Sequence, residues 1–192
     1  MKIGVIGVQG AVSEHIEMTN KVLKELEIDG EAFWLKTQKE ALECNAFIIP
    51  GGESTTITDL MKRTGLWNIV KTSQKPIMGT CAGLVILSKA GMYEIEKTGQ
   101  ELMGLLNCKV NRNAFGRQKE SFEAELNFNN SKITGVFIRA PAVEEVYDEC
   151  KALCDVEGRI VGVEEGNVIG FSFHPELTED LSIHKYFINK LK

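Results

Sequence analysis

The first half of the chain alternates short apolar runs with longer segments of helical periodicity, and this alternation restricts the possible folds more than any other feature. Residues 3–8 are apolar throughout, as in a parallel strand that is buried on both faces of a sheet. Residues 11–26 place apolar side chains at helical spacing. Further strands are predicted at 32–35, 46–49 and 77–78. This order predicts a doubly wound, mostly parallel sheet.

Helices are expected between these strands. Ser54 or Thr55 can cap a helix that ends near Arg63, because a side-chain oxygen at the cap accepts a hydrogen bond from a free backbone N–H. Shorter helices are expected from residue 65 and at 84–87.

The second half of the chain contains short strands separated by turns. They are expected at 105–110, 122–126, 136–138, 159–163 and 168–173, and they indicate antiparallel hairpins with a return to the main sheet. A closing helix is expected at 183–191. No linker, repeat or low-complexity stretch interrupts the chain, so residues 1–192 are interpreted as one domain. The predicted fold class is an α/β three-layer sandwich, with a mostly parallel central sheet, helices on both faces and an antiparallel strand excursion.

Composition excludes several classes of function. The formal net charge is −5 and no basic run occurs, so no nucleic-acid partner is expected. No apolar stretch approaches the ~18 residues of a membrane span, and the apolar N-terminus is too short for a signal peptide. The five cysteines are scattered, which disfavours a disulfide framework and favours a reducing cytoplasm. Cys150 and Cys154 lack a nearby histidine and are interpreted as ordinary thiols rather than a zinc site.

Cys81 is the candidate nucleophile. It lies in the pentapeptide Gly79-Thr80-Cys81-Ala82-Gly83, between an apolar strand and a helical run. A nucleophile on such a sharp turn needs small residues two positions before and after it, because the backbone is crowded there. The turn also places the thiol at a helix N-terminus, where the partial positive charge favours the thiolate.

His174 is the candidate base. It follows an apolar strand, and the proline after it favours extended backbone at His174. In an extended chain, residues two apart point to the same side, so Glu176 can approach the His174 ring and orient it. The other histidines, His15 and His184, lie in predicted helices. A hydrolase-type triad with Cys81 is the favoured interpretation, and a surface histidine with a chance acidic neighbour is the alternative.

Three loops are expected at one edge of the sheet. Gln9 and Gly10 follow the first strand, residues 50–54 follow the third, and Cys81 follows the fourth. Ligands bind open parallel sheets beyond the carboxyl ends of the strands. The N–H groups of the Gly51-Gly52 turn and of Ala82 are the expected donors to an oxyanion, although Pro-Gly-Gly can also be a simple tight turn. A phosphate-binding loop is disfavoured because no Gly-Lys-Ser/Thr follows.

Two arginines are further candidates. Arg139 ends the apolar run 136–138, where a charge needs a partner or solvent. It can recognise a substrate carboxylate, and the alternative is a salt-bridged or snorkelling side chain. Arg112 lies between two asparagines and is ordinary on sequence alone.

Taken together, these motifs resemble the class-I glutamine amidotransferases. The cysteine turn, the Pro50-Gly51-Gly52 turn and His174-Pro175-Glu176 correspond to that family's signatures. Further blocks resemble one branch of the family, the glutaminase subunits of pyridoxal 5′-phosphate synthases. These blocks are residues 7–12, 50–56, 113–118, 121–124, 136–141 and 172–180.

The resemblance implies a role for each matching residue. Cys81 would attack the side-chain amide of L-glutamine to form a glutamyl thioester, His174 would transfer the protons, and Glu176 would orient His174. Gln9 would complete the oxyanion hole when a partner docks. Residues 93–103 fit the pattern loosely and are interpreted as a variable surface loop. The residues implied to contact glutamine are Gly52, Glu53, Ser54, Arg112, Ile138 and Arg139.

The resemblance also implies a partner. Ammonia would pass to a separate (β/α)₈-barrel synthase subunit, which forms a dodecameric core with up to twelve glutaminase subunits. The synthase would make pyridoxal 5′-phosphate from ribose 5-phosphate and glyceraldehyde 3-phosphate. No metal or bound cofactor is expected in the present chain. Two other functions are weighed: another cysteine hydrolase on a similar sheet, and a catalytically silent module that only docks to a synthase. The intact triad and the Pro-Gly-Gly-Glu turn disfavour both.

Overall fold

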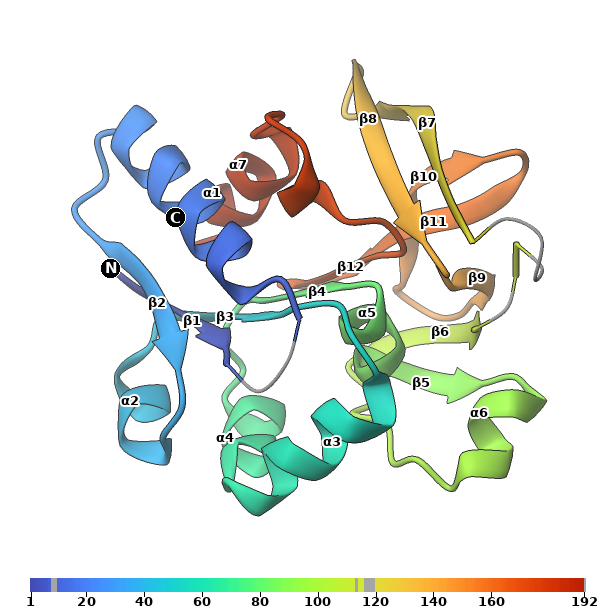
Figure 1. The fold of residues 1–192 in the computed structure, drawn as a ribbon, viewed down its shortest axis with the longest axis horizontal. Helices are drawn as coiled ribbons and strands as arrows, with labels where there is room; N and C mark the ends of the chain where they lie inside the picture. Colours follow the sequence, from blue (N-terminus) through green and yellow to red (C-terminus); the bar gives the residue numbers. More distant parts are fainter. Residues whose placement is uncertain (8–9, 113, 116–119, 192) are drawn as a thin grey trace.

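One long mixed sheet crosses the molecule, with helices on both of its faces (Figure 1). The computed structural model describes residues 1–7, 10–112, 114–115 and 120–191. Within these residues the sheet has ten strands, ordered β2-β1-β3-β4-β12-β11-β9-β6-β5, with β10 paired to β11. A second sheet consists of the β7–β8 ribbon alone. The predicted α/β class, with helices on both faces of a mostly parallel sheet and an antiparallel excursion, is confirmed.

The parallel half of the sheet is built from the strands predicted in the first half of the chain, together with one late strand. All four residues of β3 are buried. Alternate side chains pack on opposite faces of the sheet, Ala46 and Ile48 on one face and Phe47 and Ile49 on the other. The strand β12 returns from the second half and pairs in parallel with β4. The bounds are β1 Lys2–Ile6, β2 Glu31–Leu35, β3 Ala46–Ile49, β4 Ile77–Thr80 and β12 Val168–Phe171.

The remaining strands form the antiparallel excursion. Four of its pairings in the main sheet are antiparallel, and β5 pairs with β6 in parallel. The ribbon of β7 and β8 stands beside this sheet, next to β10 and β11 (Figure 1). The bounds are β5 Ser88–Gly91, β6 Leu106–Asn111, β7 Ser121–Phe128, β8 Ser131–Ile138, β9 Ala142–Val146, β10 Lys151–Val156 and β11 Arg159–Glu165.

The helices divide between the two faces of the sheet, each over its own hydrophobic core. On one face α1 packs against α7 and the core includes residues of the β7–β8 ribbon; on the other, α3 packs against α4 and α5. The helices predicted near 11–26 and 183–191 are confirmed as α1 and α7. The bounds are α1 Val12–Glu25, α2 Gln38–Glu43, α3 Ser54–Arg63, α4 Leu66–Thr72, α5 Ala82–Leu87, α6 Tyr93–Thr98, the 3₁₀ helix η1 Pro175–Leu177, and α7 Ser182–Asn189.

Two local predictions were wrong. The cap of α3 is neither Ser54 nor Thr55 but Glu53, whose carboxylate accepts from the Thr56 N–H at 2.8 Å. A carboxylate suits this place because it also meets the positive end of the helix dipole. Residues 93–103 are not simply a surface loop, because they contain α6, and Ile95 and Met103 are buried in the core on that face.

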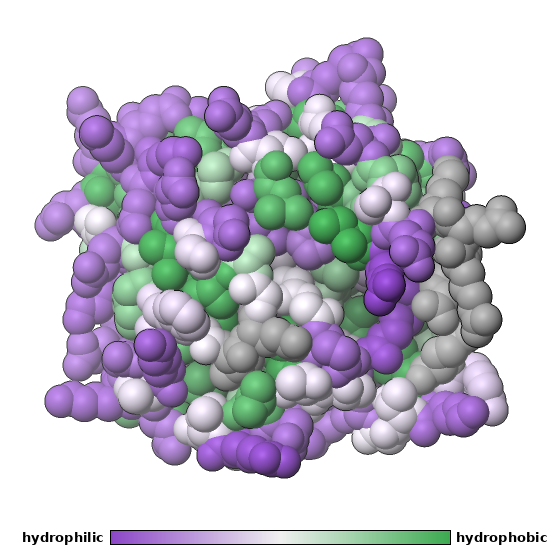
Figure 2. Space-filling view, in the orientation of Figure 1, coloured by the Kyte–Doolittle hydropathy of each residue, from purple (hydrophilic) through white to green (hydrophobic). Residues whose placement is uncertain are grey.

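The surface is polar over most of the viewed face, and hydrophobic residues gather toward its middle (Figure 2). In the part of the chain that the structure describes, no helix combines the length and the apolar character that crossing a bilayer requires.

Candidate active site

Cys81 lies at the tip of the turn that joins β4 to α5. Its backbone is strained, with φ 49° and ψ −103°, in a region that residues with a side chain rarely occupy. The surrounding structure holds it there. The Cys81 N–H donates to the Phe171 carbonyl at 2.7 Å, and the Cys81 carbonyl accepts from Val85 N–H at 3.3 Å. The geometry is that of a strand–nucleophile–helix turn.

The two glycines of the cysteine turn are required by close packing. A Cβ at Gly79 would lie 2.6 Å from the backbone carbon of Gly83, and a Cβ at Gly83 would overlap the carbonyl of Ile49. Helix α5 therefore approaches β3 and β4 more closely than any side chain would allow. This explains why the pentapeptide has glycine two positions on either side of the cysteine.

His174 and Glu176 are brought together just after β12. The backbone N–H of His174 donates to the Val136 carbonyl at 2.8 Å, and this bond connects the loop to β8. The His174 Nδ1 lies 2.7 Å from Glu176 Oε1. The predicted contact is present, but the extended backbone that was expected to produce it is not: residues Pro175–Leu177 form the 3₁₀ helix η1. The tight turn, rather than strand alternation, folds the carboxylate back onto the ring.

Electrostatics favour a charged His174 and an ionised Glu176. Burial alone would lower the pKa of His174, but hydrogen bonds to Cys81 and Glu176 outweigh it and raise that pKa to about 10. Burial would likewise raise the pKa of Glu176, but the neighbouring His15 and His174 rings hold it below its usual value. At neutral pH the loop therefore presents an imidazolium beside the Cys81 sulfur.

A cavity of about 420 Å³ opens in front of Cys81. Gly51 packs closely against the imidazole and the cysteine, since a Cβ at Gly51 would overlap His174 Cε1 and would come 3.4 Å from Cys81 Cβ. Val85 and Pro141 line this cavity but were not foreseen from the sequence. The residues that line it are Gly52, Glu53, Ser54, Cys81, Ala82, Val85, Arg112, Arg139 and Pro141.

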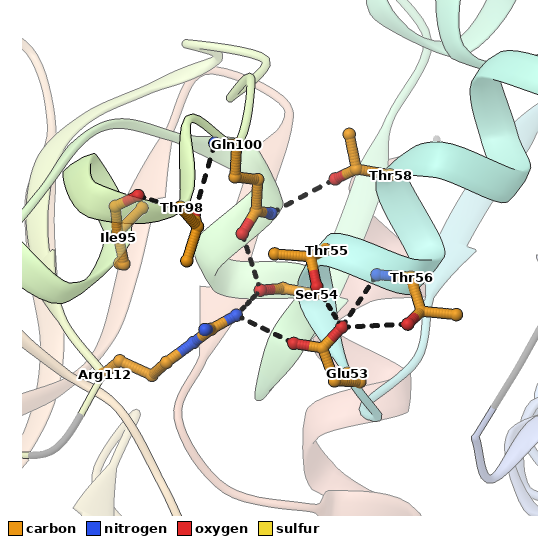
Figure 3. A network of polar contacts seen from close by, with 9 residues as sticks. All are labelled: Glu53, Ser54, Thr55, Thr56, Thr58, Ile95, Thr98, Gln100 and Arg112. Atoms are coloured by element: carbon orange, nitrogen blue, oxygen red, sulfur yellow. Dashed lines mark hydrogen bonds and ion pairs between the residues drawn. The ribbon is translucent and has the colours of Figure 1, made fainter.

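Glu53, Ser54 and Arg112 form a charged wall of this cavity (Figure 3). The Arg112 guanidinium donates to Glu53 Oε1 at 3.2 Å and to the Ser54 hydroxyl. Burial would raise the pKa of Glu53, but hydrogen bonds from Thr55 and Thr56 and the charge of Arg112 hold it below its usual value. The wall therefore offers an anion and a cation side by side.

Gln100 holds this wall through two hydrogen bonds, and it was not among the residues predicted for the site. Its Oε1 accepts from the Ser54 hydroxyl at 2.9 Å, and its Nε2 donates to the Thr58 hydroxyl at 3.2 Å (Figure 3). The segment that follows α6 thus reaches the start of α3. No sequence motif marks Gln100, because the contact depends on how two distant segments pack.

The other residues predicted for the site differ in where they lie relative to the cavity and to Cys81. Arg139 lines the cavity, but its side chain is 79% exposed and lies 3.7 Å from the Glu120 carboxylate. Ile138 presents its carbonyl 4.0 Å from Cys81 Sγ. Gln9 lies outside the described residues, as do Asn113 and residues 116–118 of the predicted 113–118 block; the neighbouring Gly10 packs against the Gly51 carbonyl.

His15 and His184 belong to the surroundings of Glu176, which sequence reasoning missed. Both are fully buried, and His15 Nε2 lies 3.3 Å from Glu176 Oε2. Helices α1 and α7 bring the two rings together, and Glu176 links His15 to His174. Among the described residues, no group of three or more potential metal ligands is found.

Similarity to known proteins agrees with this geometry. The protein-family model of the SNO glutamine amidotransferases matches residues 5–192. The chain belongs to this family. A solved structure described as a glutamine amidotransferase superimposes on this amidotransferase with a TM-score of 0.86 and 38% identity, covering 98% of both chains.

Two curated relatives match this amidotransferase along its whole length. Both are named pyridoxal 5′-phosphate synthase subunit PdxT. The protein from Methanosarcina mazei is 50% identical over 196 residues, covering 100% of this chain and 98% of its own. The protein from Pyrococcus abyssi is 51% identical over 196 residues, covering 99% of each. A thiol, an imidazolium and a carboxylate beside a charged cavity can support nucleophilic attack on a carbonyl group, which suits an amidotransferase.

Proposed function

We propose that this amidotransferase hydrolyses L-glutamine to L-glutamate and ammonia and is the glutaminase subunit of a pyridoxal 5′-phosphate synthase. The observation that carries the proposal is the continuous contact from Cys81, which lines the cavity, through His174 to Glu176. The same three residues in separate places would support no such reaction. The names of the relatives supply the biosynthetic setting.

In the first half-reaction, the Cys81 thiolate adds to the side-chain amide carbon of glutamine. The new oxyanion accepts hydrogen bonds from the N–H groups of the Gly51-Gly52 turn and of Ala82. The C–N bond then breaks, and the nitrogen leaves as ammonia with the proton that His174 donates. A glutamyl thioester on Cys81 and a neutral His174 remain.

In the second half-reaction, His174 takes a proton from water as the oxygen adds to the thioester carbon. The C–S bond breaks, which releases glutamate and restores the Cys81 thiolate beside a protonated His174. Glu176 accepts a hydrogen bond from the ring throughout and keeps it aligned. The sum is glutamine plus water giving glutamate plus ammonia.

The charged wall suits a free amino acid. Arg112 complements an α-carboxylate, and Glu53 complements an α-ammonium group. Ser54 and Gly52 lie beside them in the cavity, and Arg139 lies at the exposed side, where it can close over the substrate. The Ile138 carbonyl lies next to the sulfur, where it can orient the amide. This division of charge favours glutamine over an uncharged amide.

The partner in this proposal is a (β/α)₈-barrel synthase subunit, with a dodecameric core and up to twelve glutaminase subunits. Ammonia in neutral water is mostly protonated, and the ammonium ion is not a nucleophile. A protected route to the synthase would deliver ammonia in its unprotonated, reactive form. The location proposed is the cytoplasm, and Gln9 is proposed to join the oxyanion hole on docking.

The substitution Cys81→Ala tests the ammonia-donor role. With the synthase subunit added, we expect it to abolish glutamine-dependent synthesis of pyridoxal 5′-phosphate and to leave ammonia-dependent synthesis intact. The matched control is Cys154→Ala, a buried cysteine that does not line the cavity and should keep both activities. Equal loss of both activities in the Cys81 variant would refute the proposal.

Docking is expected to activate the site. The isolated chain should hydrolyse glutamine slowly, and the rate should rise when the synthase is added, as measured by glutamate release. Transfer of ¹⁵N from the glutamine side chain into the pyridine ring checks delivery. A fully active isolated chain would contradict activation by docking, but it would not contradict glutamine hydrolysis by this chain.

A further inference from the structure

The three histidines of the chain form one buried line that ends at the nucleophile. His184 Nε2 lies 3.1 Å from His15 Nδ1, and His15 Nε2 lies 3.1 Å from the Thr80 hydroxyl and 3.3 Å from Glu176 Oε2. Glu176 Oε1 in turn contacts His174. His15 thus touches both loops that carry the triad, since Thr80 directly precedes the cysteine.

The tautomer of His15 follows from its neighbours. If His15 carried its proton on Nδ1, its bare Nε2 would face the Glu176 carboxylate, and the buried Nδ1–H of His184 would have no acceptor. If it carries the proton on Nε2, that N–H faces Glu176 and Thr80, and His184 donates its own Nε2–H to His15. The unpartnered atom is then His184 Nδ1, a lone pair, which costs less than an unpaired N–H.

Burial favours the neutral form of both rings. It lowers the pKa of His15, and it lowers that of His184 to about 3. The titratable groups that face His15 are Glu176, His174, His184 and, from its own helix, Glu14. Glu176 is the one it contacts with its Nε2.

We propose that His15 is a positioning residue, which donates its Nε2–H to Glu176 Oε2 while His184 fixes it in that tautomer. The inference rests on the proposed glutaminase function. Glu176 Oε2 is fully buried and has no hydrogen-bond partner among the described residues, while His15 Nε2 lies 3.3 Å away, so a small rotation that turns this N–H toward Oε2 satisfies it. The carboxylate is then held at both oxygens, one toward His15 and one toward His174, and it cannot rotate away from the reacting ring.

Two substitutions separate positioning from packing. In His15→Gln the amide nitrogen reaches the place of Nε2 and keeps the donor to Glu176. In His15→Asn the amide ends near the place of Nδ1 and loses that donor. Thr19→Val is the matched control, a nearly isosteric change at another buried position of α1. All are assayed for glutamine hydrolysis with the synthase present, per active site titrated with a thiol-alkylating glutamine analogue.

His15→Asn is expected to lower kcat about 10- to 100-fold, the loss of one buried hydrogen bond to a charged group, with KM changed less than about twofold. The alkaline limb of kcat/KM should also move to lower pH, because a less firmly held Glu176 lets His174 lose its proton more easily. His15→Gln should recover most of kcat and the pH limb, and Thr19→Val should match the wild type.

A merely structural role would lower kcat equally in both His15 variants and would leave the alkaline limb of kcat/KM where it is. That result overturns the inference. So does wild-type behaviour of His15→Asn. Nuclear magnetic resonance of the ¹⁵N-histidine-labelled wild-type chain needs no substitution: a neutral Nε2–H tautomer is expected for His15, and an Nδ1–H tautomer refutes the inference. The proposed function fails separately, if the wild type with synthase hydrolyses no glutamine.

Discussion

Gly51 shows how much of the site depends on the absence of a single methyl group. Its backbone lies so close to His174 and Cys81 that no Cβ fits between them. The turn can therefore point N–H groups at the place where an oxyanion would form, while it also sets the limit to movement of the imidazole. A larger residue would have to move the base, the turn or both.

The substitution Gly51→Ala should lower glutamine hydrolysis at least about 100-fold, because catalysis is sensitive to displacements of the reacting groups by about 1 Å. The measurement is kcat with the synthase present, with circular dichroism to verify folding. Gly99→Ala is the control: it meets open space, so it can cost stability through its positive φ but should leave kcat unchanged. Full activity of Gly51→Ala would show that the close contact is unimportant.

The residues of the proposed triad could be selected from the sequence, and the buried residues that contact them could not. Cys81 has a local motif, and His174 and Glu176 are two positions apart, so short-range rules select them. His15 and His184 are separated by 169 positions and meet only because α1 and α7 pack together. Nothing in the local sequence around a histidine in an amphipathic helix predicts that it will contact a histidine of another helix.

At the scale of elements, the segment after α6 is the least expected participant. Gln100 links the start of α3 to α6 through Ser54 and Thr58 (Figure 3). Ser54 is thereby held between Gln100 and Arg112. The position of a cavity-lining hydroxyl thus depends on a segment that lies outside every motif.

Gln100→Leu should raise KM for glutamine about 3- to 10-fold and change kcat little, because one or two neutral hydrogen bonds that position the binding wall are lost. Steady-state kinetics with the synthase present measure this. Glu101→Gln is the control, since Glu101 is exposed and pairs with Lys62 and Lys71 instead of Ser54. An unchanged KM in the Gln100 variant would contradict the support role.

The elements that sequence reasoning missed are short or atypical. Helix α2 has only six residues, but Thr37 and Glu40 form a reciprocal capping box, a signal that was present and overlooked. Strands β9 and β10 carry charged residues toward solvent and have weak apolar patterns. Their strand state depends on pairing with β6 and β11, which no local rule reveals.

At the scale of the whole molecule, the neutral histidines couple folding to pH. His184 has an ordinary pKa near 6.5 in the unfolded chain and a pKa of about 3 when folded. Between these values the unfolded chain binds a proton that the folded chain does not. Stability therefore falls as pH falls through this window, by up to about 1.4 kcal/mol per pH unit for each such histidine.

Urea unfolding at pH 7, 6 and 5 measures this dependence. The wild type should lose stability steadily below pH 6.5, and His184→Gln should lose less, because one group no longer titrates. His174 is protonated in the folded chain throughout this range and titrates near 6.5 in the unfolded chain, so it contributes equally to wild type and variant and cancels in their comparison. The lowered carboxyl pKa values, such as that of Glu53, act only at lower pH. Equal slopes in wild type and variant would contradict the coupling.

The β7–β8 ribbon has a consequence for how the reacting groups are aligned. Val136 and Ile138 are two residues apart on β8, so their carbonyls face the same way, one bonded to the His174 N–H and the other next to the Cys81 sulfur. Eight cross-strand partners, from Ser121↔Ile138 to Phe128↔Ser131, fix the register. A slip of one residue would turn both carbonyls away together. The pairing of this ribbon therefore determines where two carbonyls lie, one beside the Cys81 sulfur and one bonded to the His174 backbone.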